Sequence, residues 1–249
     1  MFKRIFMATV LSTHSLTIGY SAKSPLMRNI NITLRTGELT IITGENGTGK
    51  STLLKTITKI IKPLEGKIYL NDLEIREISS KDFSKSVAVV LTDRLESENF
   101  TAEEVISFGR SPYTGFFGRL SADDYSIIKG VAEELKIEKL LPKHFYELSD
   151  GQKQKVLIAK ALTQQANVII LDEPTAFLDF KAKDEIFALL KKIAAQKDIA
   201  VLASTHDIYQ AAKYGNEFWV MENNDITVTQ NNPYFSVTNP SSEILGQLS

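Results

Sequence analysis

The stretch Gly44-Glu-Asn-Gly-Thr-Gly49-Lys50-Ser51 matches the pattern G-x-x-x-x-G-K-[ST] in full. Glycines at these spacings let the backbone wrap around a polyphosphate, with successive N–H groups pointing inward. The apolar run Leu39–Thr43 before it predicts a strand, and a helix is expected from Gly49 to about Ile61, ended by Pro63. This strand–loop–helix context predicts that the loop and the positive end of the helix bind the phosphates of a nucleotide.

Three side chains that follow the glycines have separate expected roles. Lys50 is expected to contact the β- and γ-phosphate oxygens, Ser51 to ligate Mg²⁺, and Thr52 to hold an α-phosphate oxygen. The other residues expected to bind the nucleotide are those of the loop itself: Gly44, Glu45, Asn46, Gly47, Thr48 and Gly49.

A second motif, Val168-Ile-Ile-Leu-Asp172-Glu173, predicts a buried strand that delivers two carboxylates at its C-terminal end. An apolar strand ending in Asp-Glu is by itself more often a strand entering a turn. Beside a phosphate-binding loop, however, Asp172 is expected to hold the Mg²⁺ and Glu173 to act as the general base that polarises an attacking water.

His206 ends the next predicted strand, in Ala203-Ser-Thr-His206. A lone histidine more often has a structural explanation than a catalytic one. Because the order of the strands carries His206 to the same sheet edge as Glu173, we expect its imidazole to contact the γ-phosphate.

Alternating apolar strands and helix-period segments favour the α/β class, with a sheet that is largely parallel. The first third is rich in strand patterns, and the stretches after Gln165 predict two buried strands around one helix. The expected strands are Ala8–Ile18, Ile30–Leu34, Glu38–Thr43, Lys67–Leu70, Val87–Leu91, Val168–Leu171 and Ile199–Ala203, and the expected helix is Lys181–Gln196.

Capping boxes that begin at Thr101, Ser121 and Ser149 predict the starts of three helices in the middle of the chain. We therefore expect a helical insert at about residues 94–165, within a core formed by residues 1–93 and 166–249. The chain is expected to be a single domain of 249 residues.

Composition excludes several other classes. The 249 residues are 43% hydrophobic and 24% charged, which excludes disordered and fibrous proteins. The net charge of -1 gives no basic field for nucleic acid, so no nucleic-acid partner is expected. The absence of Cys excludes disulfides and thiolate sites. No apolar run reaches the roughly 18 to 20 residues that span a bilayer. The N-terminus is interpreted as a strand and not as a signal peptide, with either Met1 or Met7 as the start.

These motifs, in this order, resemble the ATP-binding subunit of an ABC transporter from about Thr9 to Glu222. The segment Leu148-Ser-Asp-Gly-Gln152 looks like the signature of that family, where Ser149 would cap a helix whose free N–H groups suit a γ-phosphate from a second subunit. The resemblance implies that Ser149, Gly151, Gln152 and Asp179 contact nucleotide across a dimer, that His206 is the switch histidine, and that Tyr20 stacks on adenine.

The segments Ser107–Tyr113 and Gly118–Asp124 look like those of importers of iron(III)-siderophores, haem and cobalamin. Two positions depart from the family pattern. Thr92, followed by Asp93, stands where a glutamine is usual, and Asp150 replaces the third signature residue, usually glycine. We expect Thr92 or Asp93 to complete the outer shell of the metal.

The resemblance implies a P-loop NTPase core of the ABC ATPase type, with an N-terminal antiparallel β region and a helical insert subdomain. It also implies an ATPase with ATP and Mg²⁺ as cofactors, a homodimer that sandwiches ATP, and binding to membrane permease subunits at the cytoplasmic face of the membrane. An extracytoplasmic substrate-binding protein would be an indirect partner. The alternatives are an exporter subunit, a soluble ABC ATPase that acts on ribosomes or DNA, and an unrelated P-loop kinase or GTPase.

Overall fold

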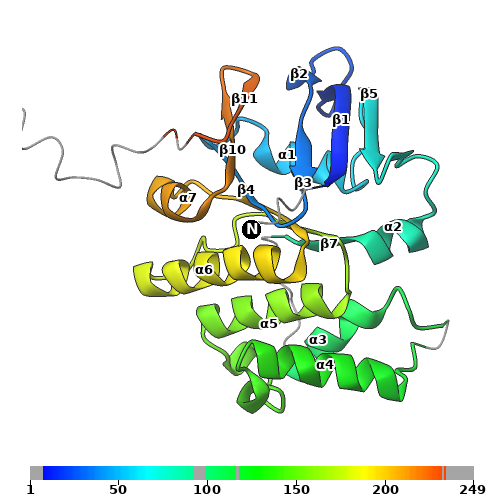
Figure 1. Ribbon diagram of the computed structural model, residues 1–249, viewed down its shortest axis with the longest axis vertical. Helices are drawn as coiled ribbons and strands as arrows, with labels where there is room; N and C mark the ends of the chain where they lie inside the picture. The colour runs from blue at the N-terminus through cyan, green and yellow to red at the C-terminus, as the bar shows by residue number, and fades with distance from the viewer. Residues whose placement is uncertain (1–7, 92–98, 116–117, 232, 234–249) are drawn as a thin grey trace, which may run out of the picture.

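The largest sheet in the computed structural model has six strands in the order β11-β10-β4-β9-β8-β7 (Figure 1). Five of these strands run parallel, and β11 pairs antiparallel with β10 at one edge. Their bounds are β4 Leu39–Gly44, β7 Val87–Val90, β8 Val168–Leu171, β9 Ala200–Ser204, β10 Glu217–Glu222 and β11 Asp225–Thr229. The structure describes residues 8–91, 99–115, 118–231 and 233.

A second, antiparallel sheet is built around β1 (Thr9–Ile18). This strand pairs with β2 (Met27–Ile30), β3 (Thr33–Arg35) and β5 (Glu65–Leu70), and β5 pairs with β6 (Leu73–Glu74). The antiparallel β region expected in the N-terminal part of the chain is therefore present.

One predicted strand, Ile30–Leu34, is wrong in its extent. The chain forms two short strands there, β2 and β3, and both pair with β1. The side chain of Thr13 fills the gap between them, because its hydroxyl donates to the Ile30 carbonyl at 2.9 Å and accepts from the Ile32 N–H at 3.1 Å. Because the Thr13 hydroxyl pairs with the Ile30 carbonyl and the Ile32 N–H, the hydrogen-bond ladder can be interrupted here while both backbone groups keep a partner.

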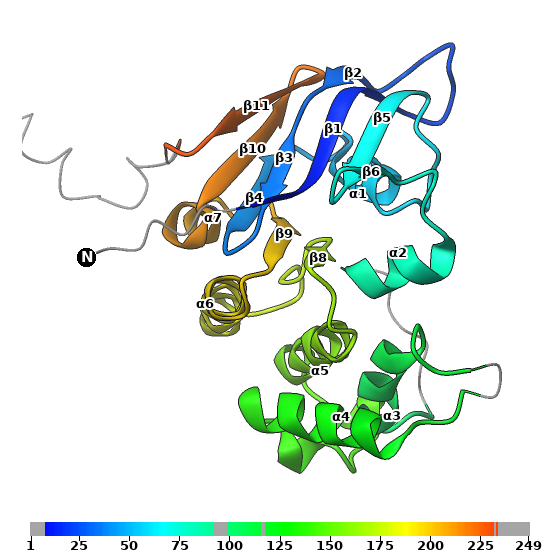
Figure 2. The ribbon, with the colours of Figure 1, turned by 45° about the vertical axis from the view of Figure 1, so that its right-hand side comes forward.

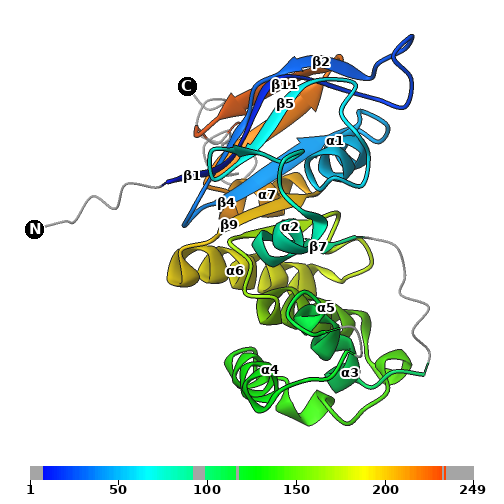
Figure 3. The same cartoon turned by 90° about the vertical axis from the view of Figure 1, so that its right-hand side faces the viewer.

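Helix α1 (Lys50–Ile57) follows the phosphate-binding motif and lies between the two sheets (Figure 3). Its buried residues Leu53, Leu54 and Ile57 share a core with both sheets. The helix ends before the expected Ile61, because the Thr58 hydroxyl donates to the Leu54 carbonyl at 2.7 Å and Lys59 has a φ of 64°, in the left-handed region.

The remaining longer helices cover the other face of the six-stranded sheet and extend away from it (Figures 1 and 2). Residues Leu39 and Ile41 of β4 belong to the core on this face, whereas Ile42 belongs to the core with α1, as expected for a strand buried on both sides. The helices of this group are α3 Ala102–Ser107, α4 Ala122–Glu134, α5 Asp150–Thr163, α6 Phe180–Lys197 and α7 Ile208–Tyr214, with single 3₁₀ turns at Phe108–Arg110, Glu138–Leu140 and Phe145–Glu147. The short helix α2 (Ser80–Ser86) instead buries Phe83 in the core that contains α1.

The three predicted capping boxes are confirmed at the starts of α3, α4 and α5. In each, the side chain of the cap residue (Thr101, Ser121 or Ser149) accepts from the third backbone N–H of its helix, and the third side chain accepts from the backbone of the cap. The helices of the middle of the chain therefore begin where the sequence predicts. The domain bounds at residues 93 and 166 stay a prediction.

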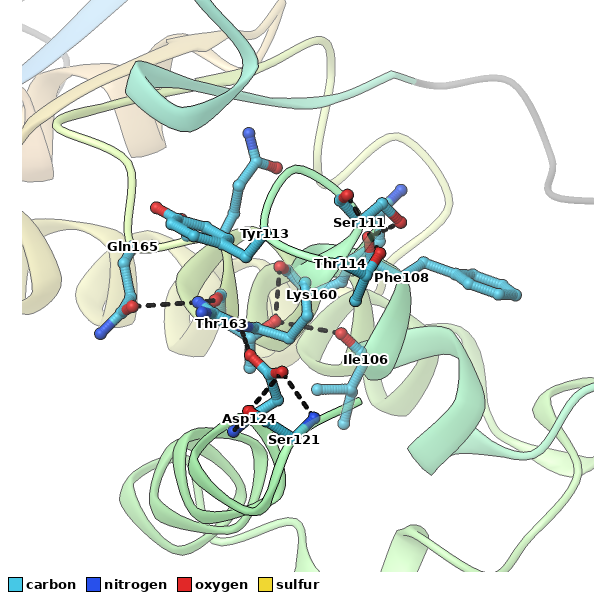
Figure 4. Close-up of polar contacts among 12 residues, drawn as sticks. Ile106, Phe108, Ser111, Tyr113, Thr114, Ser121, Asp124, Lys160, Thr163 and Gln165 are labelled. Atoms are coloured by element: carbon cyan, nitrogen blue, oxygen red, sulfur yellow. Dashed lines mark hydrogen bonds and ion pairs between the residues drawn. The ribbon is translucent and has the colours of Figure 1, made fainter. Parts of the chain in front are cut away.

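Arg110 joins the two segments that resemble siderophore importers. It is only 5% exposed, and its Nε donates to Asp124 Oδ1 at 2.7 Å. Its Nη1 donates both to the Thr163 carbonyl at 2.6 Å and to Gln165 Oε1 at 2.9 Å, while the Tyr113 ring lies 4.0 Å from the guanidinium. Figure 4 shows the partners Tyr113, Asp124, Thr163 and Gln165 grouped together. The start of α4 is thereby fixed to the end of α5.

The pKa of Asp124 is lowered to about 2, first by the backbone and hydroxyl of Ser121 and then by Arg110. The carboxylate accepts from the Ser121 N–H at 2.8 Å and from the Ser121 hydroxyl at 2.7 Å. Hydrogen bonds to the charged form stabilise it, so Asp124 stays ionised beside the guanidinium at neutral pH.

Candidate functional site

The predicted motifs meet at one edge of the six-stranded sheet, because their strands are parallel neighbours. In the register of the sheet, Ile42 of β4 lies opposite Ser204 of β9, and Ala203 of β9 lies opposite Leu171 of β8. The phosphate-binding loop, the carboxylates Asp172 and Glu173, and His206 follow these three strand ends directly. Carboxyl ends of parallel strands are where α/β sheets bind ligands.

The loop from Gly44 to Gly49 requires glycine at its two ends. Gly44 has a φ of 150°, and a Cβ there would lie 2.4 Å from the Met221 carbonyl oxygen. Gly49 caps α1 with a φ of 102°, which L side chains rarely adopt. Between them, Glu45, Asn46 and Gly47 are exposed and Thr48 is partly buried.

Lys50 points back into this loop from the first turn of α1. Its Nζ donates to the carbonyls of Gly44 at 2.7 Å and Glu45 at 3.0 Å, and the residue is buried. The ammonium group therefore lies inside the curve of the loop, where the sequence analysis expects the phosphates.

Ser51 and Thr52 follow Lys50 and face different surroundings. Ser51 is exposed, whereas Thr52 is buried and its hydroxyl lies 3.4 Å from the Tyr20 hydroxyl, within hydrogen-bond distance. Tyr20 comes just after β1 and is 73% exposed. The structure thus brings Tyr20 to the helix of the phosphate loop, with its ring outside the core.

Asp172 and Glu173 differ in exposure although they are adjacent. Asp172 is buried, while the side chain of Glu173 is 21% exposed and its backbone is left-handed, with a φ of 45°. The Glu173 Oε2 lies 2.9 Å from Nδ1 of His206, whose side chain is 54% exposed. The carboxylate and the imidazole therefore meet at the surface of the sheet edge, as expected from the order of the strands.

Ser204, which was not among the predicted site residues, links the two carboxylate residues. Its hydroxyl donates to Asp172 Oδ1 at 2.7 Å and accepts from the Glu173 N–H at 2.7 Å. The available signal was a polar residue that ends the otherwise apolar run Ala200–Ala203, two positions before His206.

The signature residues and Asp179 lie at the starts of α5 and α6. Ser149 caps α5 with Gln152, and Asp179 Oδ1 accepts from the Ala182 N–H at 2.8 Å as the cap of α6. A Cβ built at Gly151 would lie 3.6 Å from the Ala182 Cβ, so the two helix starts are close to each other. Asp150 is exposed in the first turn of α5, where a negative charge favours the helix.

Two oxygen donors expected to hold a metal, Ser51 and Asp172, lie at this edge. A hydroxyl and a carboxylate suit Mg²⁺, which binds few protein ligands and completes its shell with water and phosphate. The described part of the chain has no group of three or more His, Cys, Asp or Glu residues that could hold a metal ion by themselves. Thr92, the third expected ligand, and Asp93 lie outside the described residues.

Among the described residues, no helix has the length and apolar character needed to cross a lipid bilayer.

Comparisons with known proteins identify the family. Residues 27–176 match the ABC transporter family. An uncharacterized ABC transporter ATP-binding protein of Methanocaldococcus jannaschii is 43% identical over 217 residues, 87% of this chain and 74% of that protein. The iron(3+)-hydroxamate import ATP-binding protein FhuC of Bacillus subtilis is 36% identical over 206 residues, 83% of this chain and 76% of FhuC.

The fold is likewise that of solved ABC proteins. A transporter described as being of the metal-chelate type, in an inward-facing conformation, superposes with a TM-score of 0.79 at 27% identity and covers 90% of this chain and 84% of its own. The predicted fold class is therefore confirmed. ATP binding and ATP hydrolysis are the activities of this family, and its importer subunits pair with membrane permeases. This chain belongs to the ABC transporter family, as an ATP-binding subunit with ATPase activity.

Proposed function

We propose that this chain hydrolyses Mg²⁺-bound ATP at the sheet edge and thereby drives the import of an iron(III)-siderophore chelate. The single observation that carries the hydrolytic part is the 2.9 Å contact between Glu173 and His206, at strand ends that adjoin the phosphate loop. The direction and the substrate are supported by FhuC and by the transporter of the metal-chelate type, which are similar to this chain.

Each residue of the edge has a role that its position supports. The loop N–H groups and the Lys50 ammonium bind the β- and γ-phosphates, and Thr52 holds an α-phosphate oxygen. Tyr20 stacks on the adenine. Glu173 accepts a proton from the attacking water, and His206 donates a hydrogen bond to the γ-phosphate.

Ser51 and Asp172 would hold the Mg²⁺, and the role proposed for Thr92 is in the outer shell. The metal neutralises charge on the β- and γ-phosphate oxygens when it is bound. The buried carboxylate of Asp172 and the exposed hydroxyl of Ser51 supply hard oxygen ligands from the segments that follow β8 and β4, on either side of β9.

The site is completed by a second copy of the chain. Ser149 leaves the next N–H groups of α5 at the surface, and the positive end of this helix suits a γ-phosphate. Gly151 and Gln152 belong to the same helix start, and Asp179 lies beside it. ATP bound between the loop of one copy and α5 of the other closes the dimer, and hydrolysis opens it.

The membrane permease is proposed to bind at the helical part of the chain. A cavity of about 480 Å³ opens between α3 and α4 and is lined by the exposed rings of Phe100, Phe108 and Tyr125 together with Glu103. Exposed aromatic groups around a cavity are typical of surfaces that bind another protein. This contact would hold the chain at the cytoplasmic face of the membrane, and the extracytoplasmic binding protein would act through the permease.

Two measurements test this proposal. The purified chain is expected to release phosphate from ATP without any acceptor, which a kinase does not do. Cells that make the permease together with this chain are expected to take up radioactive iron(III)-hydroxamate, and cells with the Glu173→Gln chain are not. Phosphate release without uptake of iron(III)-hydroxamate would support the ATPase activity and contradict the proposed substrate.

A further inference from the structure

Neither the sequence motifs nor the family comparison assigns a role to Ser204. It is the last residue of β9 and is completely buried, between β4 on one side and β8 on the other. Every other residue of β9 is apolar. A hydroxyl at the centre of a sheet must find hydrogen-bond partners, because an unpaired buried hydroxyl is costly.

Both partners of the Ser204 hydroxyl belong to the two carboxylate residues. Its single proton is donated to Asp172 Oδ1, and its oxygen accepts from the Glu173 N–H, each at 2.7 Å. One hydroxyl therefore fixes the carboxylate of the first residue and the peptide group of the second. These are short bonds, and the one to a carboxylate is of the stronger, charge-assisted kind.

The backbone of Glu173 makes the second bond important. With a φ of 45°, Glu173 is in the left-handed region that L side chains adopt at a cost. Such a conformation persists only when its surroundings hold it in place. The Ser204 bond holds the Glu173 N–H from the neighbouring strand, and on the same residue the carboxylate reaches His206.

We propose that Ser204 is a positioning residue for hydrolysis: it holds Asp172 in the orientation that binds the metal and Glu173 in the orientation that meets the water. The proposal rests on the proposed function of the sheet edge and adds to it a residue that touches neither nucleotide nor metal. Its effect is expected first on metal affinity, because residues that orient a metal ligand through a hydrogen bond typically change that affinity about 10- to 100-fold when removed.

The test measures metal binding directly. Mn²⁺ is titrated into the chain saturated with a non-hydrolysable ATP analogue, and free Mn²⁺ is counted by its electron paramagnetic resonance signal. Ser204→Ala is expected to weaken Mn²⁺ binding about 10-fold or more, while binding of the analogue in EDTA stays at the wild-type value. Ser204→Cys keeps the size of the side chain and a weak S–H donor, so its affinity is expected between the two.

Thr163→Val is the matched control. Thr163 is also completely buried, and its hydroxyl bonds to the Ile106 and Lys160 carbonyls in the helical part of the molecule. Its loss is expected to lower thermal stability and to leave Mn²⁺ binding unchanged. Equal Mn²⁺ binding in wild type and both Ser204 variants would overturn the proposal, and so would an equal loss in Ser204→Ala and Thr163→Val.

The two proposals fail in different ways. If the wild-type chain neither binds Mn²⁺ with the analogue nor hydrolyses ATP, the proposed function itself is wrong. If the wild type does both and the Ser204 variants match it, only the positioning role is wrong. Should Ser204→Ala not fold, the comparison of wild type with Ser204→Cys decides the question in the same assay.

Discussion

Two clusters of polar side chains in this molecule differ in their exposure to water. At Arg110, a buried guanidinium is surrounded by partners from its own chain: Asp124, the Thr163 carbonyl, Gln165 and the face of Tyr113. At the sheet edge, the side chain of Glu173 is 21% exposed and that of His206 is 54% exposed. The charged pair of the first cluster, Arg110 and Asp124, is buried, whereas the second cluster is open to water.

This difference in exposure indicates that the first cluster stabilises the fold and the second carries out the chemistry. Buried charges whose hydrogen bonds are made within the chain hold elements together, here the start of α4 and the end of α5. Charged groups at the surface of a strand edge keep the capacity to bind phosphate, water and metal. We therefore expect changes at Arg110 to alter unfolding and changes at the sheet edge to alter hydrolysis.

The largest effect is expected for Glu173→Gln, which keeps the shape of the side chain and removes its basicity. ATP hydrolysis should fall about 10²-fold or more, because general-base catalysis contributes about 10²- to 10⁴-fold. ATP binding and the urea midpoint of unfolding should stay close to wild type. Glu77→Gln, at an exposed position, is the control for the loss of a charge. Wild-type phosphate release from Glu173→Gln would contradict the role of this carboxylate.

The next effect is expected for Arg110→Met, which leaves the ionised Asp124 buried without its guanidinium. The free energy of unfolding in urea should fall by about 3 kcal/mol. Lys129→Met breaks the exposed pair of Lys129 and Glu133, whose atoms are 3.9 Å apart, and should change it by less than about 0.5 kcal/mol. The turnover of the folded Arg110→Met protein should be near that of wild type. If Arg110→Met lost turnover and kept its stability, Arg110 would serve the chemistry and not the fold, which would contradict this comparison of the two clusters.

A smaller effect is expected for Lys50→Ala, which removes one charged group from the phosphate loop. ATP binding should weaken by about 1.5 to 3 kcal/mol, the range for a hydrogen bond to a charged group. Lys55→Ala, in the last turn of the same helix, should bind ATP as wild type does. Equal ATP affinity in Lys50→Ala and Lys55→Ala, measured by titration calorimetry, would show that Lys50 does not contribute to ATP binding.

The smallest effect concerns acid stability. Because the pKa of Asp124 is about 2 in the folded chain, below its ordinary value of 3.8, the ionised carboxylate stabilises the fold above about pH 4. This contribution is lost as the pH falls from about 4 to about 2. Unfolding free energies of wild type and Asp124→Asn should therefore converge over that interval. A difference that stays constant from pH 5 to pH 2 would contradict a lowered pKa of Asp124 in the folded chain.

Short sequence motifs correctly predicted the features that depend on residues close together in the chain, such as the starts of helices and tight turns. The capping boxes placed the starts of α3, α4 and α5, since each depends on residues three apart. The glycine pattern placed the turn between β4 and α1. Strand order then placed Asp172, Glu173 and His206 at a common edge, because parallel neighbours end on the same side.

Other contacts between distant residues were not predicted. Arg110 reaches the Thr163 carbonyl 53 residues away, and Ser204 reaches Asp172 across 32 residues, with no periodic pattern to mark either pair. The break between β2 and β3 depends on the Thr13 hydroxyl of another strand. The end of α1 at Ile57 depends on the left-handed Lys59, which helix propensity does not encode.

Whether the phosphate chemistry lies at the open cluster can be seen directly in a crystal structure of the Glu173→Gln chain with ATP and Mg²⁺. We expect the β-phosphate within the loop from Gly44 to Ser51, the metal beside Ser51 and Asp172, and the γ-phosphate between His206 and Ser149 of a second copy. A nucleotide bound away from the Gly44 loop, or a γ-phosphate remote from residue 173 and His206, would contradict this expectation.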